Sequence, residues 1–399
     1  MTDKRIIYVD NAATTAMSER AIEAAMPYMR GVYGNPSSLH GEGQRAKEAL
    51  EAARARIAAR LGCEPREVYF TSGGSEADNQ AIRSAAETGA KRGKKHIVST
   101  AFEHHAVLHT LKKLEREGFE VTYLDVGAAG VVSAAQVAEA LRPDTALVTV
   151  MFANNEIGTL QPIAEIGAVC REKGVTFHTD AVQAVGHVPV DVKAMNIDML
   201  SLSAHKFHGP KGVGALYCRR GLPLAAFIEG GAQERGRRAG TENLPWIVAM
   251  AAALDDACDS MEKTAATERR LCDRLIDGLS RIPHSRLNGD RTRRLPSIVN
   301  MCFEGIEGEG LLLLLDDAGI CASSGSACTS GALDPSHVLL ALGLPHEVAH
   351  GSLRLSLSEA TTDADVDAIL AAVPRVVEYL RDMSPVWEQL EKGERPHLI

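Results

Sequence analysis

Long apolar segments are missing from this sequence. The longest run of leucines, residues 311–315, ends at Asp316 and Asp317, far short of the ~20 apolar residues that a membrane-spanning helix needs. The first residues, MTDKRIIYVDNAATT, pass at once into the strand-like stretch IIYV and contain neither the apolar core of a signal peptide nor an amphipathic presequence. We therefore expect a soluble, cytoplasmic protein with no membrane partner.

An excess of basic residues is also missing. The formal net charge is -9, and charged residues make up an ordinary 24% of the chain. This balance argues against nucleic acid or an anionic membrane as the main partner. A small polar or zwitterionic substrate stays open.

Paired cysteines are the third absence. The cysteines are scattered without any CxxC pair, so the pattern indicates neither a zinc ribbon nor a disulfide framework and fits a reducing compartment. Free cysteines are commonly buried, and we interpret all except Cys328 as small apolar side chains. These are Cys63, Cys170, Cys218, Cys258, Cys272, Cys302 and Cys321.

The order of the apolar patterns predicts the fold class. From about residue 62 to residue 216, β-rich stretches alternate with helical patterns: VYF then AIRSAAE, HIVST then HAVLHTLKKLERE, ALVTVMF then PIAEIGAVCREKG, followed by VTFHTD, DMLSLS and GALYC. Such alternation is typical of βαβ units. We expect an α/β protein whose mostly parallel sheet is flanked by helices.

The length of the chain predicts two domains. At 399 residues it exceeds the size at which one hydrophobic core usually stops growing. A helix-compatible segment, residues 249–282, leads to a second unit containing SIVNMCF, SLRLSLS and a C-terminal helix from about Asp363. We expect a large domain at residues 15–255 and a smaller α+β domain at residues 1–14 and 256–399.

Three chemical groups follow predicted strands, where connected α/β layers place their ligands. The turn TSGGS after Phe70 leads into a helix and forms either an anion cradle or a plain capped turn. Asp180 ends VTFHTD, with a helix N-cap as its alternative role, and Lys206 follows an apolar strand directly, which favours amine chemistry. An anion cradle, a carboxylate and an amine are together what pyridoxal phosphate needs.

A histidine-rich segment, EHHAVLHT, follows another predicted strand. His105 and His109 stand four residues apart, so a two-histidine metal face is one interpretation. No further carboxylate or cysteine lies at a supporting spacing, and we expect no metal. His104 at a strand end fits better as a side chain that stacks on a flat cofactor ring and moves protons.

One cysteine is set among small residues. The stretch SSGSACTSG, residues 323–331, surrounds Cys328 with glycine, serine and alanine, which leave no bulk to hide its sulfur. We therefore expect Cys328 to be an accessible thiol with a chemical role.

With these residues identified, the chain resembles the cysteine desulfurases of the NifS/IscS kind, which are class V aminotransferase-like enzymes of pyridoxal-phosphate fold type I. The resemblance covers nearly the whole chain. Its motifs are DNAATT (10–15), YGNPSSLH (33–40), FTSGGSEADNQAI, EHHAV, NNEIGTLQPI (154–163), HTDAVQAVGH, SLSAHKFHGPKGVGALY, ERGRRAGTEN (234–243), SSGSACTSG and RLSLSEATT (354–362). The block around Lys206 combined with SSGSACTSG is specific to this group.

The resemblance implies a fold, a reaction and its catalytic residues. The fold is a mostly parallel sheet of about seven strands with a smaller C-terminal domain. The reaction converts L-cysteine to L-alanine with pyridoxal 5'-phosphate as cofactor. Lys206 would hold the cofactor and act as base, His104 would stack on its ring, and Cys328 would take the sulfur as a persulfide.

The resemblance also implies binding residues. The cofactor-binding set is Gly74, Ser75, Asn155, Asp180, Gln183, Ser203, His205, Lys206 and Thr241. Asp180 would pair with the pyridine nitrogen, while Gln183 and Asn155 would contact the phenolic oxygen region or the substrate. Arg354 would bind the substrate carboxylate through a bidentate fork. Family members are homodimers, and Thr241 would complete the phosphate site of a second copy.

The implied partner is a sulfur-acceptor protein, such as an iron-sulfur scaffold, so the sulfur would serve iron-sulfur cluster assembly or another sulfur-containing cofactor. A selenocysteine lyase or a cysteine sulfinate desulfinase would share the chemistry of Lys206 and depend less on Cys328. The motif SSGSACTSG favours a desulfurase. A catalytically silent, partner-binding scaffold is the alternative of a different class, and the intact catalytic residues count against it.

Overall fold

The computed structural model describes residues 5–324 and 335–399. Its largest sheet has seven strands in the order β2-β8-β7-β6-β5-β3-β4. They are β2 (Val68–Thr71), β3 (His96–Thr100), β4 (Glu120–Leu124), β5 (Thr145–Thr149), β6 (Thr176–Asp180), β7 (Met199–Ser203) and β8 (Gly214–Cys218). Only β8 runs against its neighbours in this sheet. The predicted α/β class and mostly parallel sheet are therefore confirmed.

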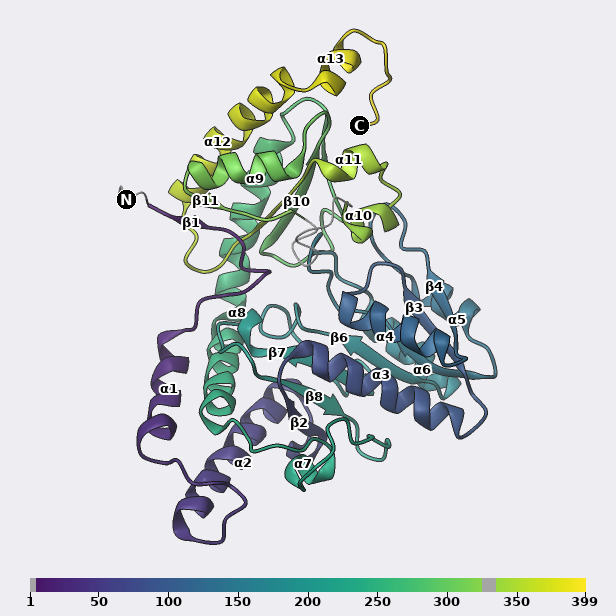
Figure 1. Cartoon of the computed structure of the whole chain (residues 1–399), viewed down its shortest axis with the longest axis vertical. Helices are drawn as coiled ribbons and strands as arrows, with labels where there is room; N and C mark the ends of the chain where they lie inside the picture. Colours follow the sequence, from purple (N-terminus) through teal and green to yellow (C-terminus); the bar gives the residue numbers. More distant parts are fainter. Residues whose placement is uncertain (1–4, 325–334) are drawn as a thin grey trace.

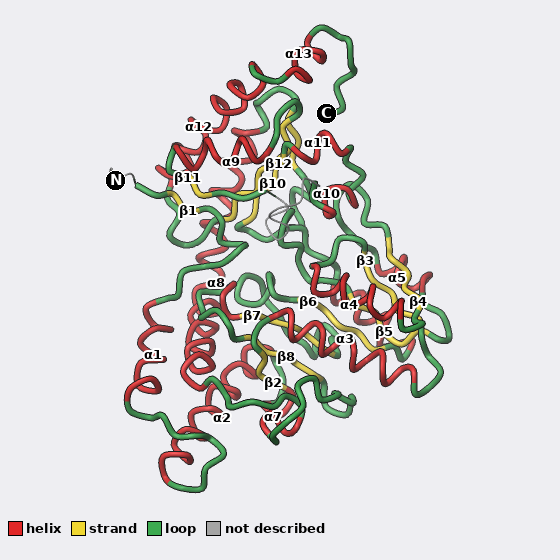
Figure 2. Tube along the Cα trace, in the orientation of Figure 1, coloured by secondary structure: helices red, strands yellow, loops and turns green. Residues whose placement is uncertain are grey.

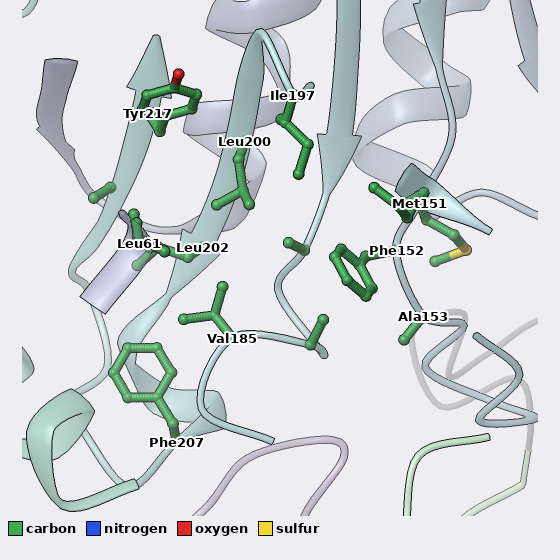
Figure 3. Close-up of a cluster of buried hydrophobic side chains, with 14 of the residues drawn as sticks. Leu61, Met151, Phe152, Ala153, Val185, Ile197, Leu200, Leu202, Phe207 and Tyr217 are labelled. Atoms are coloured by element: carbon green, nitrogen blue, oxygen red, sulfur yellow. The ribbon is translucent and has the colours of Figure 1, made fainter. Parts of the chain in front are cut away.

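Helices surround this sheet, as Figure 1 shows. They are α2 (Gly41–Leu61), α3 (Gly74–Ala90), α4 (His105–Arg116), α5 (Ala134–Ala140), α6 (Ile163–Lys173) and α7 (Gln233–Gly236), with short 3-10 turns η1 (Pro65–Glu67) and η2 (Ala204–Lys206). Every residue of β3, β5, β7 and β8 is buried, which is expected of a sheet covered on both faces. Figure 3 shows part of this core, with Leu200 and Leu202 of β7 near Val185 and Phe207.

A single long helix connects the sheet to the second unit. Helix α8 (Leu244–Leu279) is 36 residues long, and α1 (Glu19–Arg30) packs beside it together with α2. The predicted long helix is confirmed, although it begins five positions earlier than expected. Pro245 at its first turn marks that start, because proline suits the first helical positions.

The second unit is an α+β arrangement (Figure 2). Strands β9 (Ser285–Leu287), β10 (Ile298–Phe303) and β12 (Ser352–Ser356) form an antiparallel sheet in the order β12-β10-β9, and β1 (Ile7–Tyr8) pairs with β11 (Ile320–Cys321). Its helices are α9 (Gly308–Asp317), α10 (His337–Ala341), α11 (His346–His350), α12 (Asp363–Asp382) and α13 (Pro385–Glu391). Helix α12 begins at Asp363, as expected.

The apolar interior divides along α8. Residues 247–254 of this helix pack into the cluster around the large sheet, whereas Leu271, Leu275 and Leu279 pack into a second cluster with β10 and α12. Segment 338–349 packs with the first cluster. The domain division at residue 255 stays a prediction.

Two simpler properties concern the described residues alone. None of their helices combines the length and the apolar character needed to cross a membrane. Seven of the cysteines are described, all as free thiols, of which four are buried and three half-buried.

Candidate active site

Lys206 lies at the end of η2, directly after β7. Its Nζ donates to the carbonyl oxygens of Ala12 and Ala13 at 2.6 and 2.9 Å. Gln183 Nε2 donates to the same Ala12 oxygen at 2.9 Å. The DNAATT segment therefore brings the amine of Lys206 and the amide of Gln183 to the same carbonyl oxygen, that of Ala12.

His205 is fixed by the same segment. Its Nδ1 is hydrogen-bonded to Thr14 Oγ1 at 3.1 Å, and its carbonyl oxygen accepts from the backbone amide of Thr15 at 3.0 Å. Burial, together with the charges of Lys206 and Lys211, lowers the pKa of His205 to about 4. Its ring is neutral at physiological pH and acts as a hydrogen-bonding group.

Asp180 ends β6 and is buried. Its Oδ1 accepts from the backbone amide of Val182 at 3.0 Å. Side-chain atoms of Asp180, Asp78 and His104 that could bind a ligand all lie within 4.8 Å of one another. Burial raises the pKa of Asp180, and the neighbouring His104 and Lys206 oppose that shift.

His104 caps the N-terminus of α4. Its Nδ1 accepts from the backbone amide of Ala106 at 3.1 Å. The remaining proton of a neutral His104 is therefore on Nε2. Burial lowers the pKa of His104, so the neutral ring is favoured. A neutral imidazole of this kind can stack on an aromatic ring and exchange a proton through Nε2.

The histidines beside His104 form a cluster of rings. The rings of His105 and His109 stack with centroids 5.0 Å apart, and His337 lies 4.5 Å from His105. His337 Nε2 donates to the carbonyl oxygen of Glu103 at 2.9 Å. Among the described residues, His105 and His109 belong to no group of three converging ligand-type side chains.

Residues behind Asp180 were missed by the sequence analysis. Asp78 on α3 is fully buried, and its Oδ1 lies 3.6 Å from His178 Nε2. His178 is hydrogen-bonded to Thr149 and to Ser201. His178 and Asp180 stand two positions apart on β6. Residues two apart in a strand point to the same face of the sheet, so the sequence alone would have placed both on one face.

These buried groups differ in charge. Burial lowers the pKa of His178 to about 3, so its ring is neutral. Burial raises the pKa of Asp78 well above its usual range, and the nearby charge of Asp180 raises it further. Two carboxyl groups this close do not both ionise readily. The raised pKa of Asp78 therefore favours its protonated form beside Asp180.

A bare turn precedes α3. Gly73 is its N-cap and supplies no side-chain cap, and Gly74 begins the helix. Amides in the first turn of a helix have no partner within it and attract anions. Ser203 Oγ lies 3.6 Å from the point that a Cβ on Gly73 would occupy. Ser75, the next residue, is exposed.

This donor set fits pyridoxal phosphate. The turn at Gly74 and Ser75 offers amides and a hydroxyl to a phosphate, Asp180 offers a charged carboxylate to a pyridinium nitrogen, and Lys206 offers the amine. Two buried carboxyl oxygens, Asp78 Oδ1 and Glu103 Oε2, have no hydrogen-bond partner among the described residues. The residues thus match the polar groups of the cofactor.

Arg354 on β12 contacts the N-terminal segment that also holds Lys206. Its Nη2 pairs with Asp10 Oδ1 at 2.7 Å, and its Nη1 donates to the carbonyl oxygen of Asn155 at 3.1 Å. Its Nε is buried and has no hydrogen-bond partner among the described residues. Arg354 and Asn155 are therefore in contact, and their role in substrate binding stays a prediction. Asp10, which pairs with Arg354, was not predicted.

Cys328 lies outside the described residues. The described residues on either side of its segment are anchored beside the site. Ser323 exchanges backbone hydrogen bonds with Arg354 at 3.2 and 2.6 Å. On the other side, Ser336 Oγ donates to Glu156, the neighbour of Asn155.

Thr241 is exposed, and no hydrogen bond within the described parts of the chain joins it to Gly74 or Ser75. Its place in the phosphate site stays a prediction.

Comparisons with known proteins identify relatives of the whole chain. The model of the family described as Aminotransferase class-V matches residues 7–369. A cysteine desulfurase IscS from Methanosarcina thermophila is 54% identical over 385 residues, which cover 96% of this chain and 95% of that protein.

Solved structures agree with this finding. A NifS-like protein superposes with a TM-score of 0.88 at 38% identity, covering 94% of this chain and 100% of that one. A structure described as SspA in complex with cysteine gives a TM-score of 0.78 at 38% identity, with coverages of 89% and 100%. The chain therefore belongs to the aminotransferase class-V family, within its cysteine desulfurase group.

Proposed function

We propose that this protein is a cysteine desulfurase that uses pyridoxal 5'-phosphate to convert L-cysteine to L-alanine. Class-V aminotransferases and cysteine desulfurases depend on this cofactor in general. The observation that supports the proposal is that Lys206, Asp180 and the turn at Gly74 each end or follow a strand of the same sheet. Gly74 lies against Val182, two residues after Asp180, and the charge of Lys206 acts on Asp180.

The bound cofactor would supply an electron sink for the substrate's α-carbon. Asp180 would keep the ring nitrogen positively charged, and the protonated Asp78 behind it would leave that charge on Asp180. His104 would stack on the ring and offer Nε2 for proton exchange. Gly74, Ser75, Ser203 and His205 would hold the phosphate.

Lys206 would carry the cofactor and act as the base when its amine is free. The carbonyl oxygens of Ala12 and Ala13 accept hydrogen bonds from Nζ and so fix its position. Gln183, bonded to the Ala12 oxygen, would lie beside the phenolic oxygen of the cofactor. The N-terminal segment thereby orients the amine of Lys206 and the amide of Gln183.

L-cysteine would bind through its carboxylate to Arg354. The relative SspA has a structure with cysteine. Arg354 is buried and already donates to the Asp10 carboxylate, which supports a role in binding a second carboxylate. Asn155, whose carbonyl oxygen accepts from Arg354, would line the substrate site.

Cys328 would attack the substrate's sulfur as a thiolate and keep it as a persulfide, so that the carbon fragment leaves as alanine. The anchoring of Ser323 to Arg354 supports this role, because it starts the Cys328 segment at the substrate-binding arginine. The sulfur would then pass to an acceptor protein such as an iron-sulfur scaffold.

A homodimer would complete the phosphate site. Thr241 is exposed, which supports its use by a second copy of the chain. The large domain, residues 15–255, would bind the cofactor, and the smaller domain would supply Arg354 and Cys328.

The test is the formation of alanine and sulfide from L-cysteine in the presence of dithiothreitol, with the cofactor's visible absorbance recorded in parallel. Native protein should form both products in equal amounts. Cys328→Ala should keep the absorbance and release no sulfide, whereas the control Cys258→Ala on α8 should match the native protein.

Two results would oppose the proposal. If Cys328→Ala is as active as native protein, sulfur leaves by another route, and a selenocysteine lyase or a cysteine sulfinate desulfinase is the better description. If the native protein binds no cofactor, a catalytically silent scaffold is favoured.

A further inference from the structure

A separate cavity of about 390 Å³ lies on the far side of the Lys206 segment, against α8. Its lining includes Phe207 and His208, which follow Lys206 in the chain, and Ala253 and Ala257 of α8. This volume is within the range of pockets that hold small organic molecules. The reaction proposed above uses none of these four side chains.

Glu268 of α8 lines this cavity and is 3% exposed. Within residues 5–324 and 335–399, no hydrogen bond or ion pair to its carboxyl group is found. A buried carboxylate is costly unless it is paired and hydrogen-bonded. Glu268 therefore offers an unused acceptor to whatever occupies the cavity.

The other acidic groups of the lining already have partners. Glu359 Oε2 pairs with His208 Nε2 at 3.0 Å, and Asp256 pairs with Arg20 of α1. Lys263 also lines the cavity, but it is exposed and forms no ion pair with Glu268 among the described residues. Burial, together with the nearby charge of Glu359, raises the pKa of Glu268 to about 8. Its carboxyl group is therefore mostly protonated at neutral pH while the cavity is empty, and a positively charged nitrogen beside it would favour the ionised form.

Part of the remaining lining is apolar. Phe207 and Ala253 are buried, and Ala257 and Gly186 also line the cavity, next to hydroxyl side chains such as Ser260 and Thr264. A bare inorganic cation would use the carboxylate but leave the apolar part without contacts. A ligand with a positive nitrogen and a short aliphatic body would use both.

We propose that this cavity binds a small organic ammonium ligand, whose N–H groups donate to Glu268 and whose aliphatic part packs against Phe207 and Ala257. The site is distinct from the cofactor site but adjoins it. His187, another lining residue, donates through Nε2 to the Lys206 carbonyl oxygen at 2.8 Å.

The test uses diethylammonium chloride as the probe and the protein purified with its cofactor. A secondary amine is chosen because a primary amine could react at the cofactor. Saturation-transfer NMR on the probe's methyl protons measures binding without turnover, so a failed desulfurase assay would leave this test valid. Diethyl ether is the neutral probe of the same shape.

Native protein should bind diethylammonium saturably with a Kd in the millimolar range, as expected for so small a ligand, and should not bind diethyl ether. Glu268→Gln keeps the shape of the side chain, and it should weaken binding by about tenfold or more. Glu262→Gln changes an exposed residue of the same helix and should bind as native protein does.

Three results would overturn the proposal. They are the absence of saturable binding to native protein, equal affinity of Glu268→Gln and native protein, and displacement of the probe by potassium chloride but not by sodium chloride at equal ionic strength. The last result would assign the cavity to an inorganic cation.

Discussion

The charge of Asp180 depends on the neighbouring carboxyl group of Asp78. The Oδ1 of Asp180 accepts from the Val182 amide. Burial and the charge of Asp180 raise the pKa of Asp78 well above its usual range, which favours a protonated Asp78 beside an ionised Asp180. Asp180→Asn removes the charge with little change in shape. We expect it to slow alanine formation from saturating cysteine by about 100-fold, the usual cost of losing one electrostatic contact to a developing charge.

Initial rates corrected for bound cofactor measure this effect. Asp382→Asn, at an exposed position of α12, is the matched control and should have the native rate. A rate for Asp180→Asn above half of the native rate would mean that another group holds the ring nitrogen.

His208 and Glu359 predict a pH dependence. Burial lowers the pKa of His208, but the hydrogen bond and charge of Glu359 outweigh burial and raise it, while His208 lowers the pKa of Glu359. The stability from His208 is complete below its unfolded pKa of about 6.5 and is lost as pH rises through the folded pKa. That from Glu359 is present above about pH 4.3 and is lost as pH falls through its lowered pKa.

Glu359→Gln should therefore cost more free energy of unfolding at about pH 6 than at about pH 9. The cost should stay below about 1 kcal/mol, because the Glu359 side chain is 54% exposed. Urea unfolding at both pH values measures it. Glu347→Gln, which breaks an exposed pair with Arg395, should cost the same at both. A loss for Glu359→Gln that does not change with pH would contradict the assignment.

At the scale of residues, the sequence predicted the groups that stand directly after strands. Lys206 and Asp180 are such groups, because the strand that carries each one has a clear apolar pattern. Asp78 was not predicted, since a polar residue in the first turns of a helix looks the same whether it is exposed or turned inward. Asp10 was not predicted as the partner of Arg354, because the two lie 344 positions apart in the chain.

The start of α3 is the element on which the phosphate proposal depends. A Cβ added to Gly74 would lie 2.5 Å from Val182 Cγ2, and the β-branched side chain of Val182 has little freedom to move. Gly74→Ala should therefore displace the turn and weaken cofactor binding by about tenfold or more. Dialysis followed by absorbance gives the affinity.

Gly41→Ala at the start of α2 is the control, because a Cβ there meets nothing within 4 Å. An unchanged affinity of Gly74→Ala for the cofactor would show that the phosphate lies elsewhere.

The ends of strands were predicted best where the apolar pattern of the sequence stops abruptly. HIVST and GALYC coincide with β3 and β8. The stretch ALVTVMF was expected to be one strand to Phe152, but β5 ends at Thr149. Phe152 then donates its backbone amide to the Asp180 carbonyl oxygen at 2.8 Å. Apolar continuity cannot mark such an end, because the chain stays buried after it leaves the strand.

At the scale of the whole molecule, one buried ion pair connects distant segments. Arg54 of α2 binds Glu234 of α7 through two hydrogen bonds of 2.8 and 2.7 Å, and Glu234 Oε2 accepts from the Phe70 amide of β2. Glu234→Gln would leave the Arg54 charge buried and uncompensated. We expect a loss of about 3–5 kcal/mol in the free energy of unfolding.

Chemical denaturation measures this loss. Glu51→Gln removes the other, half-exposed partner of Arg54 and should cost less than about 1 kcal/mol. Similar losses for the two variants would mean that the Arg54–Glu234 pair is not what holds α2, α7 and β2 together.

The overall architecture could be predicted further than the contacts between its two units. Alternating patterns predicted the sheet, and the long helix-compatible segment predicted the connection. The N-terminal segment, however, joins Lys206 through Ala12 and Arg354 through Asp10. No local sequence pattern predicts these contacts, because they form only when both units pack against residues 10–13.

The whole proposed reaction depends on Lys206 as the residue that carries the cofactor. Reducing the purified protein with borohydride, digesting it and locating the bound cofactor by mass spectrometry tests this directly. We expect the cofactor on the peptide that contains Lys206, and none after the same treatment of Lys206→Ala. Cofactor on another lysine, such as Lys211 in the following turn, or no covalently bound cofactor at all, would contradict it.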